Sequence, residues 1–230
     1  MLHLMKLEMK KFKFGWYVKG AVIANVIITA MFFSMNYIQE VEKDVIMTNA
    51  DDAFLLIGAM VRSTFIVFAA VLLAQIVIEE YKSKTIMLMF SYPVKRKKLI
   101  ASKLAIIAIL TFITILLSNI IVTGAAFLLH GYFSFVSYPI TFTDWMMQAI
   151  NMIPFAIAAA GTSLIPLYFG MRKYSVPITI VSSLLVVSFA CSHNPGFSVA
   201  ATIPIQFALA AVGMIIAYLA IRDIEKKDAV

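Results

Sequence analysis

The chain has 230 residues, of which 62% are hydrophobic and 13% charged, and its mean hydropathy is +0.94. So little polar surface cannot cover a soluble globule, and we therefore expect an integral membrane protein without a folded soluble domain. A net charge of +7 would suit a nucleic-acid binder, but the cations lie in short loops beside apolar runs, where they face anionic lipid and set orientation. We therefore do not expect nucleic acid as a partner.

The first 52 residues predict one surface helix, one span and one outer segment. Residues 1–14 place apolar and basic side chains at helical spacing, which predicts an amphipathic helix lying flat under the inner leaflet. The apolar run at 16–38 is long enough to cross a bilayer, with Asn25 as its strongly polar residue near mid-depth. Residues 39–52 carry five acids against a single lysine, so we place them outside.

The second predicted span, 53–78, is interrupted by Arg62. A guanidinium in hydrocarbon costs about 2.5–3.5 kcal/mol on insertion scales, so Arg62 is expected to face a polar cavity or a partner. Snorkelling to Asp51, Asp52 or a lipid phosphate is the alternative. Four polar residues make up the candidate translocation path: Arg62, Asn25, Asn119 and Gln206. Hydrogen bonding between helices is the commoner use of the three amides.

A basic segment with a proline, EEYKSKTIMLMFSYPVKRKKLIASK at residues 79–103, separates the second and third apolar runs. We predict a short helix on the cytoplasmic membrane surface over residues 83–92. Ser83 can begin this helix, and Pro93 ends it because the proline ring cannot continue a helix. Four cations follow at 95–98, as is typical of a cytoplasmic loop.

This segment resembles the loop between the second and third spans of type-2 ABC exporter permeases. In that family a pattern like E-x-x-x-G-T-x-x-x-L-x-x-x-P, followed by basic residues, forms the coupling helix that docks into an ATPase. Lys84 departs from the family, which usually has glycine before the threonine. The resemblance implies these coupling residues: Glu80, Ser83, Lys84, Thr85, Met89, Phe90, Tyr92 and Pro93. The alternative is an ordinary basic loop whose only role is to fix the orientation of the spans in the membrane.

The rest of the chain continues the pattern of apolar runs and short connections. The connection at 131–144 has no lysine or arginine and is rich in aromatics, which predicts an outer loop. Pro154 and Pro166 favour kinks in the fourth span. The six predicted spans are 16–38, 53–78, 99–129, 145–170, 175–192 and 200–221. Assigned this way, Lys43 is the only one of 19 Lys and Arg residues outside, so both termini are expected in the cytoplasm.

Patterns for catalysis or metal binding are not found in the sequence. The phosphate-binding pattern G-x-x-x-x-G-K-[ST] does not occur, so ATP and magnesium are expected on a separate ATPase chain. Serine and histidine residues lack a plausible nucleophile, base and carboxylate arrangement, and the single cysteine and the histidines lack metal-ligand spacing. We expect a non-enzymatic subunit with no catalytic, cofactor or metal site.

The family resemblance implies an assembly of two permease chains, identical or similar, with two ATPase subunits in the bacterial cell membrane. Small permeases of this layout resemble those that export amphipathic or antimicrobial peptides, or protect against them, in Gram-positive bacteria. Peptide export is therefore the expected function. Removal of a lipid-like drug, sodium efflux and polysaccharide export stay open, as do an ATP-independent carrier, which would need ionisable residues along its spans, and a non-transporting scaffold.

Overall fold

The computed structural model describes residues 14–42, 50–83, 96–130, 142–194 and 197–227. The helices are α2 (Phe14–Glu42), α3 (Ala50–Leu73), the π-helix η1 (Ala74–Ile78), α4 (Glu79–Lys82), α6 (Arg96–His130), α7 (Phe142–Thr162), α8 (Pro166–Lys173), α9 (Val176–Ala190) and α10 (Ile203–Lys227). Two-residue strands, β1 (His193–Asn194) and β2 (Phe197–Ser198), pair antiparallel between α9 and α10. The expected helical fold class is confirmed, with one minimal strand pair that the sequence analysis did not predict.

Within these described stretches, five helical segments are long and apolar enough to cross a membrane, where α3 with η1 and α4 counts as one and α7 with α8 as another. They correspond to the first, second, third, fourth and sixth predicted spans. The fifth predicted span, 175–192, corresponds to α9, which has 15 residues. A helix of that length rises about 22 Å, less than a hydrocarbon core of about 30 Å. The count of six spans therefore stays a prediction.

Two predicted surface helices cannot be compared with the structure. The amphipathic helix at 1–14 lies outside the described residues except for Phe14, where α2 begins. The predicted coupling helix at 83–92 lies outside them except for Ser83, which follows α4. Both helices stay predictions.

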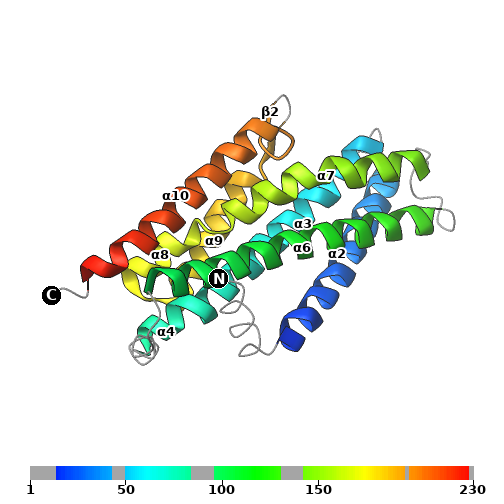
Figure 1. Cartoon of the computed structure of the whole chain (residues 1–230). Coiled ribbons are helices and arrows are strands. Elements are labelled where there is room, and N and C mark those ends of the chain that lie inside the picture. The colour runs from blue at the N-terminus through cyan, green and yellow to red at the C-terminus, as the bar shows by residue number, and fades with distance from the viewer. Residues whose placement is uncertain (1–13, 43–49, 84–95, 131–141, 195–196, 228–230) are drawn as a thin grey trace.

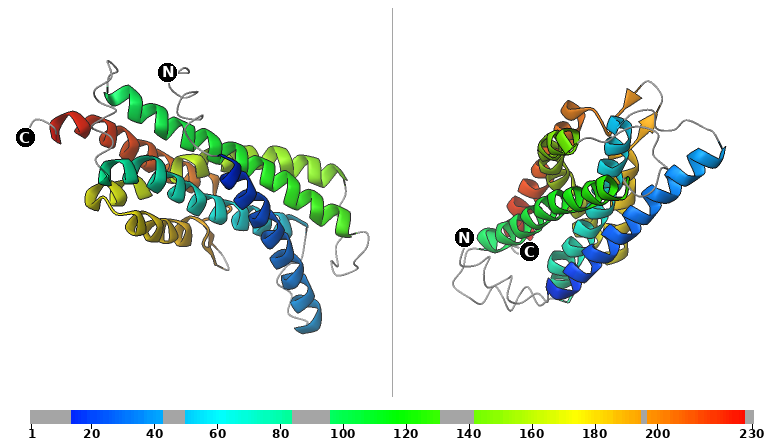
Figure 2. Two further views of the ribbon diagram at one scale, coloured as in Figure 1. Left: turned by 90° about the horizontal axis from the view of Figure 1, so that it is seen from below. Right: turned by 90° about the vertical axis from the view of Figure 1, so that its right-hand side faces the viewer.

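Helix α3 and its continuation run through the middle of the bundle, and α2 crosses one side obliquely (Figure 2). Ile57, Val61 and Phe65 of α3 are fully buried against side chains from α2, α6 and α7. Leu73 and Ile78, further along the same path, form a second apolar cluster with α6, α8 and α10. Lipid tails are as apolar as these side chains, so close packing rather than exclusion of water stabilises the bundle.

Helices α7 and α10 approach each other closely at a pair of glycines. A Cβ atom added to Gly213 would lie 2.0 Å from the backbone carbonyl oxygen of Gly161. A Cβ atom added to Gly161 would lie 2.7 Å from the Cβ atom of Ala210. Small residues allow such an approach in membranes, where backbone proximity increases van der Waals contact. The glycines thus set the distance between α7 and α10.

The fourth predicted span consists of two helices separated by a turn at residues 163–165. Pro166 is at the first position of α8, where its missing N–H leaves no additional helical bond unmade. Pro154 lies inside α7, which continues through it. Tyr174 ends α8 with φ 47°, in the left-handed region that closes many helix ends. The kinks expected at Pro154 and Pro166 stay predictions, and a new helix begins at Pro166.

At one end of the bundle lie α4, α8 and the C-terminal end of α10 (Figure 1). The antiparallel pair of β1 and β2 lies at the opposite end of α10 (Figure 1). Because α6 begins at Arg96 beside α4, the chain leaves the second long helical segment and enters the third at the same end. This end contains the candidate coupling site.

Candidate coupling site

The second long helical segment changes its winding just before the coupling residues. Residues 74–78 form a π-helix, in which the N–H of Glu79 donates to the carbonyl oxygen of Ala74. The α-helical winding resumes over Glu79–Lys82, and Ser83 ends it by donating from its hydroxyl to the carbonyl oxygen of Glu79 at 2.8 Å. Ser83 therefore closes α4, in addition to any role it has in beginning the predicted coupling helix.

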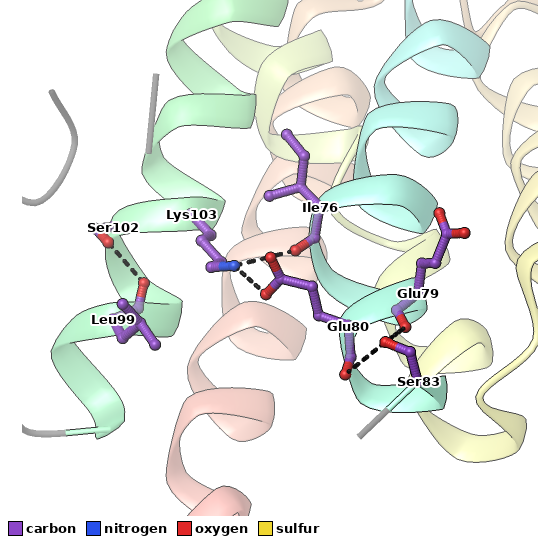
Figure 3. Close-up of polar contacts among 7 residues, drawn as sticks. All are labelled: Ile76, Glu79, Glu80, Ser83, Leu99, Ser102 and Lys103. Atoms are coloured by element: carbon purple, nitrogen blue, oxygen red, sulfur yellow. Dashed lines mark hydrogen bonds and ion pairs between the residues drawn. The ribbon is translucent and has the colours of Figure 1, made fainter. Parts of the chain in front are cut away.

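Glu80 and Lys103 form a buried ion pair between α4 and α6, which Figure 3 shows. Lys103 is 1% exposed and Glu80 is 8% exposed, so neither charge reaches solvent to any extent. The Lys103 ammonium also donates to the carbonyl oxygen of Ile76 at 3.3 Å. One cation thus bonds both to the π-helix and to the helix that follows it.

The pair lies beside a buried apolar cluster. Ile76, Ile100 and Leu104 belong to the buried cluster at this end of the bundle. Removing one partner of a buried ion pair costs about 3–5 kcal/mol, because an uncompensated charge is left behind. Replacing both partners with apolar residues is often neutral. The pair therefore holds α4 and α6 together without necessarily adding net stability.

A second contact at the same end joins α4 to α8. The rings of Tyr81 and Tyr174 stack with centroids 5.8 Å apart and an interplanar angle of 27°. Tyr174 is the residue with left-handed backbone geometry, so its ring is directed by the turn that closes α8. Three segments, α4, α6 and α8, are therefore connected through neighbouring residues of α4.

The structure describes two of the eight predicted coupling residues, Glu80 and Ser83. The other six, Lys84, Thr85, Met89, Phe90, Tyr92 and Pro93, lie outside the described residues. Lys103 was not singled out from the sequence, since it falls among the apolar residues of the third span. A lysine in the first turns of an apolar helix, past the end of a basic run, was the signal that could have found it.

Arg62 is buried inside the chain, with 3% exposure. Its Nε atom donates to the carbonyl oxygen of Gly58 at 3.0 Å, and its Nη2 atom donates to that of Ala200 at 3.0 Å. Its guanidinium lies 4.8 Å from the centre of the Phe155 ring, a cation–π contact. The Nη1 atom has no hydrogen-bond partner among the described residues. The group is thus directed at the connection before α10.

Gln206 contacts the same connection, whereas Asn25 and Asn119 do not join it. The Gln206 amide nitrogen donates to the carbonyl oxygens of Ala190 at 2.7 Å and Val199 at 2.9 Å. Asn119 donates to its own helix, and its side-chain oxygen, like that of Asn25, finds no partner in the described part of the chain. The four candidate path residues therefore do not form one described cluster.

Replacing Arg62 with lysine or leucine should loosen the connection between α9 and α10. Neither side chain can donate to two carbonyls from one planar group, and a hydrogen bond from a charged donor contributes roughly 1.5–3 kcal/mol. We expect amide hydrogen exchange at residues 191–202 to rise about tenfold or more in both variants. Gln206→Leu should have a similar effect, whereas Asn25→Leu serves as the control that leaves this connection unchanged. Equal exchange in Arg62→Leu and the unmodified chain would contradict the assignment.

The long apolar helices define the class of this chain as a multi-pass membrane protein. The model of a family described as "ABC-2 family transporter protein" matches residues 4–190, and the chain belongs to this family. It is 47% identical over 228 residues to a protein of Bacillus subtilis (strain 168) described as "Uncharacterized protein YcbO", covering 99% of this chain and 100% of that one. No solved structure matches the chain. Members of this family are membrane subunits of transporters, and ATP is hydrolysed by a separate partner.

Proposed function

We propose that this chain is the permease subunit of an exporter that moves amphipathic or antimicrobial peptides out of the cell or its membrane. Two permease chains, identical or similar, work with two ATPase subunits that bind ATP and magnesium. Membership of the ABC-2 transporter family supports the assignment as a permease. The peptide cargo rests on the resemblance to small Gram-positive permeases, and a drug, a lipid or sodium is the alternative cargo.

The observation that carries the proposal is the meeting of α4 and α6 at one end of the bundle. The residues between these helices include the predicted ATPase-coupling residues, and the Glu80–Lys103 pair joins the helices on either side. An ATPase that contacts this end would act on two long membrane helices at once. Such a contact converts closure of an ATPase dimer into movement of helices across the membrane.

We further propose that this end faces the cytoplasm in the cell membrane, with both termini inside. In this arrangement α9 is a short fifth span, and the chain crosses the membrane six times. Basic residues at the ends of four described helices support this orientation, because cytoplasmic loops carry an excess of such residues. These residues are Lys82, Lys97, Lys98, Arg172, Lys173 and Arg222. A span of 15 residues is compatible with local thinning of the bilayer.

The candidate path role of Arg62, Asn25, Asn119 and Gln206 is also a proposal. Arg62 and Gln206 bond to backbone carbonyls within this chain, so cargo would have to reach the remaining donor of Arg62 at Nη1. The buried oxygens of Asn25 and Asn119 are further acceptors for a peptide backbone. Peptide groups need such partners when they cross hydrocarbon.

Purification of the tagged chain from its own membranes in mild detergent tests the proposed assembly. We expect an ATP-hydrolysing subunit to co-purify in a one-to-one ratio, with ATP turnover that amphipathic peptides stimulate. A folded chain recovered without any ATPase, in all detergents that keep it monodisperse, would favour a carrier or a scaffold. Stimulation by sodium or by a lipid-like drug, but not by peptides, would keep the exporter and replace the cargo.

A further inference from the structure

The buried ion pair joins two positions that are 23 residues apart in the sequence and stand on either side of the predicted coupling residues. Glu80 is in α4, the last described helix before that segment, and Lys103 is in the second turn of α6, the first helix after it. The two helices belong to different long segments of the bundle. A displacement of either helix at this end therefore acts directly on the pair.

We propose that Glu80 and Lys103 are positioning residues that make α4 and α6 move as one body when the ATPase acts on this end of the permease. The inference rests on the proposed function, because it names the residues that carry the ATPase's action to both helices. Neither side chain is assigned to cargo or to ATP. Their role is to act through the helices that they connect.

An ion pair suits this role better than an apolar contact at the same place. Apolar contacts are non-directional, whereas an ion pair attracts one atom of each helix to the other. Separating Glu80 from Lys103 would break a contact between opposite charges beside an apolar cluster that includes Ile100 and Leu104. The pair therefore resists movement of α4 away from α6.

The third contact extends the link into the π-helix. Lys103 donates to the carbonyl oxygen of Ile76, which is in the middle of η1, as well as to the Glu80 carboxylate. Short π-helical segments interrupt regular winding and often occur at functional sites. Lys103 spans the junction between η1 and α4, so the winding there cannot change without breaking a bond to the cation. Movement of α4 is consequently passed on to α3 instead of being absorbed at η1.

Three variants separate this role from a purely structural one. Glu80→Gln and Lys103→Met each remove one charge of the buried pair and should lower the thermal midpoint of the chain in detergent by about 10 °C. The double variant Glu80→Met with Lys103→Met removes both charges and should return the midpoint to near its original value. Tyr17→Phe is the matched control, because it removes a different contact of α6, the hydrogen bond between Tyr17 of α2 and Thr114 at 3.2 Å, and leaves the Glu80–Lys103 pair in place.

The decisive measurement follows the labelling of an exposed reporter in inverted membrane vesicles. Lys82→Cys in a Cys191→Ser background provides an exposed thiol at the end of α4, and an impermeant maleimide reports its accessibility. ATP with vanadate, compared with no nucleotide, is the probe of ATPase closure. In chains that retain Glu80 and Lys103, and in the Tyr17→Phe control, we expect the labelling rate to change about fivefold or more.

The double methionine variant should lose this response while keeping its thermal midpoint, and that result supports the inference. A full response in the double variant would overturn it and reduce the pair to a packing contact. An unchanged labelling rate in chains that retain the pair would instead overturn the proposed function, since no ATPase would then act on this end. The two failures are thereby distinguishable.

Discussion

Replacing Gly213 with alanine is expected to destabilise the bundle by about 3 kcal/mol, at the upper end of the usual cost of overpacking. The added Cβ atom would lie 2.0 Å from the carbonyl oxygen of Gly161. A backbone oxygen in a helix cannot turn aside as the tip of a flexible side chain can, so α7 and α10 must separate. Thermal unfolding in detergent, followed by circular dichroism, measures the effect.

Gly124→Ala is the matched control for this substitution. Gly124 is inside α6, and an added Cβ atom would lie 3.9 Å from the Nε1 atom of Trp145, which is ordinary contact distance. Alanine also has a higher helix propensity than glycine. The control should therefore unfold at or slightly above the original midpoint. A Gly213→Ala variant as stable as this control would show that the crossing of α7 and α10 is not limited by the two glycines.

Changing both Met89 and Phe90 to aspartate is expected to abolish ATP-driven transport, with ATP turnover no longer responsive to cargo. Both residues belong to the predicted coupling segment and lie outside the described residues. In the proposed assembly the coupling helix docks into an apolar groove of the ATPase. Two charges placed in that groove would lose their hydration without gaining partners, which costs several kcal/mol. Co-purification of the ATPase and its turnover in reconstituted vesicles measure the loss.

The control for this pair makes the same change in net charge at a place where no docking is expected. Lys97 and Lys98 lie in the first turn of α6, after the segment, and changing both to alanine removes two positive charges without introducing acid at the apolar positions. We expect ATPase binding to survive in that variant. Transport and ATPase binding that persist in the Met89→Asp, Phe90→Asp chain would leave the coupling helix without support.

The long membrane helices could be predicted from the sequence because hydropathy over about 20 residues is a local property. α6 at Arg96–His130 and α2 at Phe14–Glu42 extend the predicted runs by a few residues at each end. The fifth span was harder to assign, because an apolar run does not reveal where Cys191 ends α9. A kink was expected at Pro166, where α8 begins, since proline acts on its own backbone.

Contacts between residues that lie far apart in the sequence could not be predicted from the sequence. The partners of Arg62 are backbone carbonyls at Gly58 and Ala200, and a carbonyl group leaves no trace in the residue type. Lys103 and Glu80 are 23 positions apart, so their pairing depends on how two helices meet and not on any local pattern. The crossing of Gly161 with Gly213 likewise belongs to the packing of α7 on α10.

The π-helix before α4 has a consequence for the register of the whole second segment. A π-helical turn contains an extra residue compared with an α-helical one, and each residue of an α-helix turns the chain by about 100°. Rewinding Ala74–Ile78 as a regular α-helix, with no residue lost, would therefore rotate α4 by about that angle relative to α3. Glu80 would then face away from Lys103. A relative with one residue fewer at these five positions can wind as a regular α-helix and should keep an acid that faces the lysine.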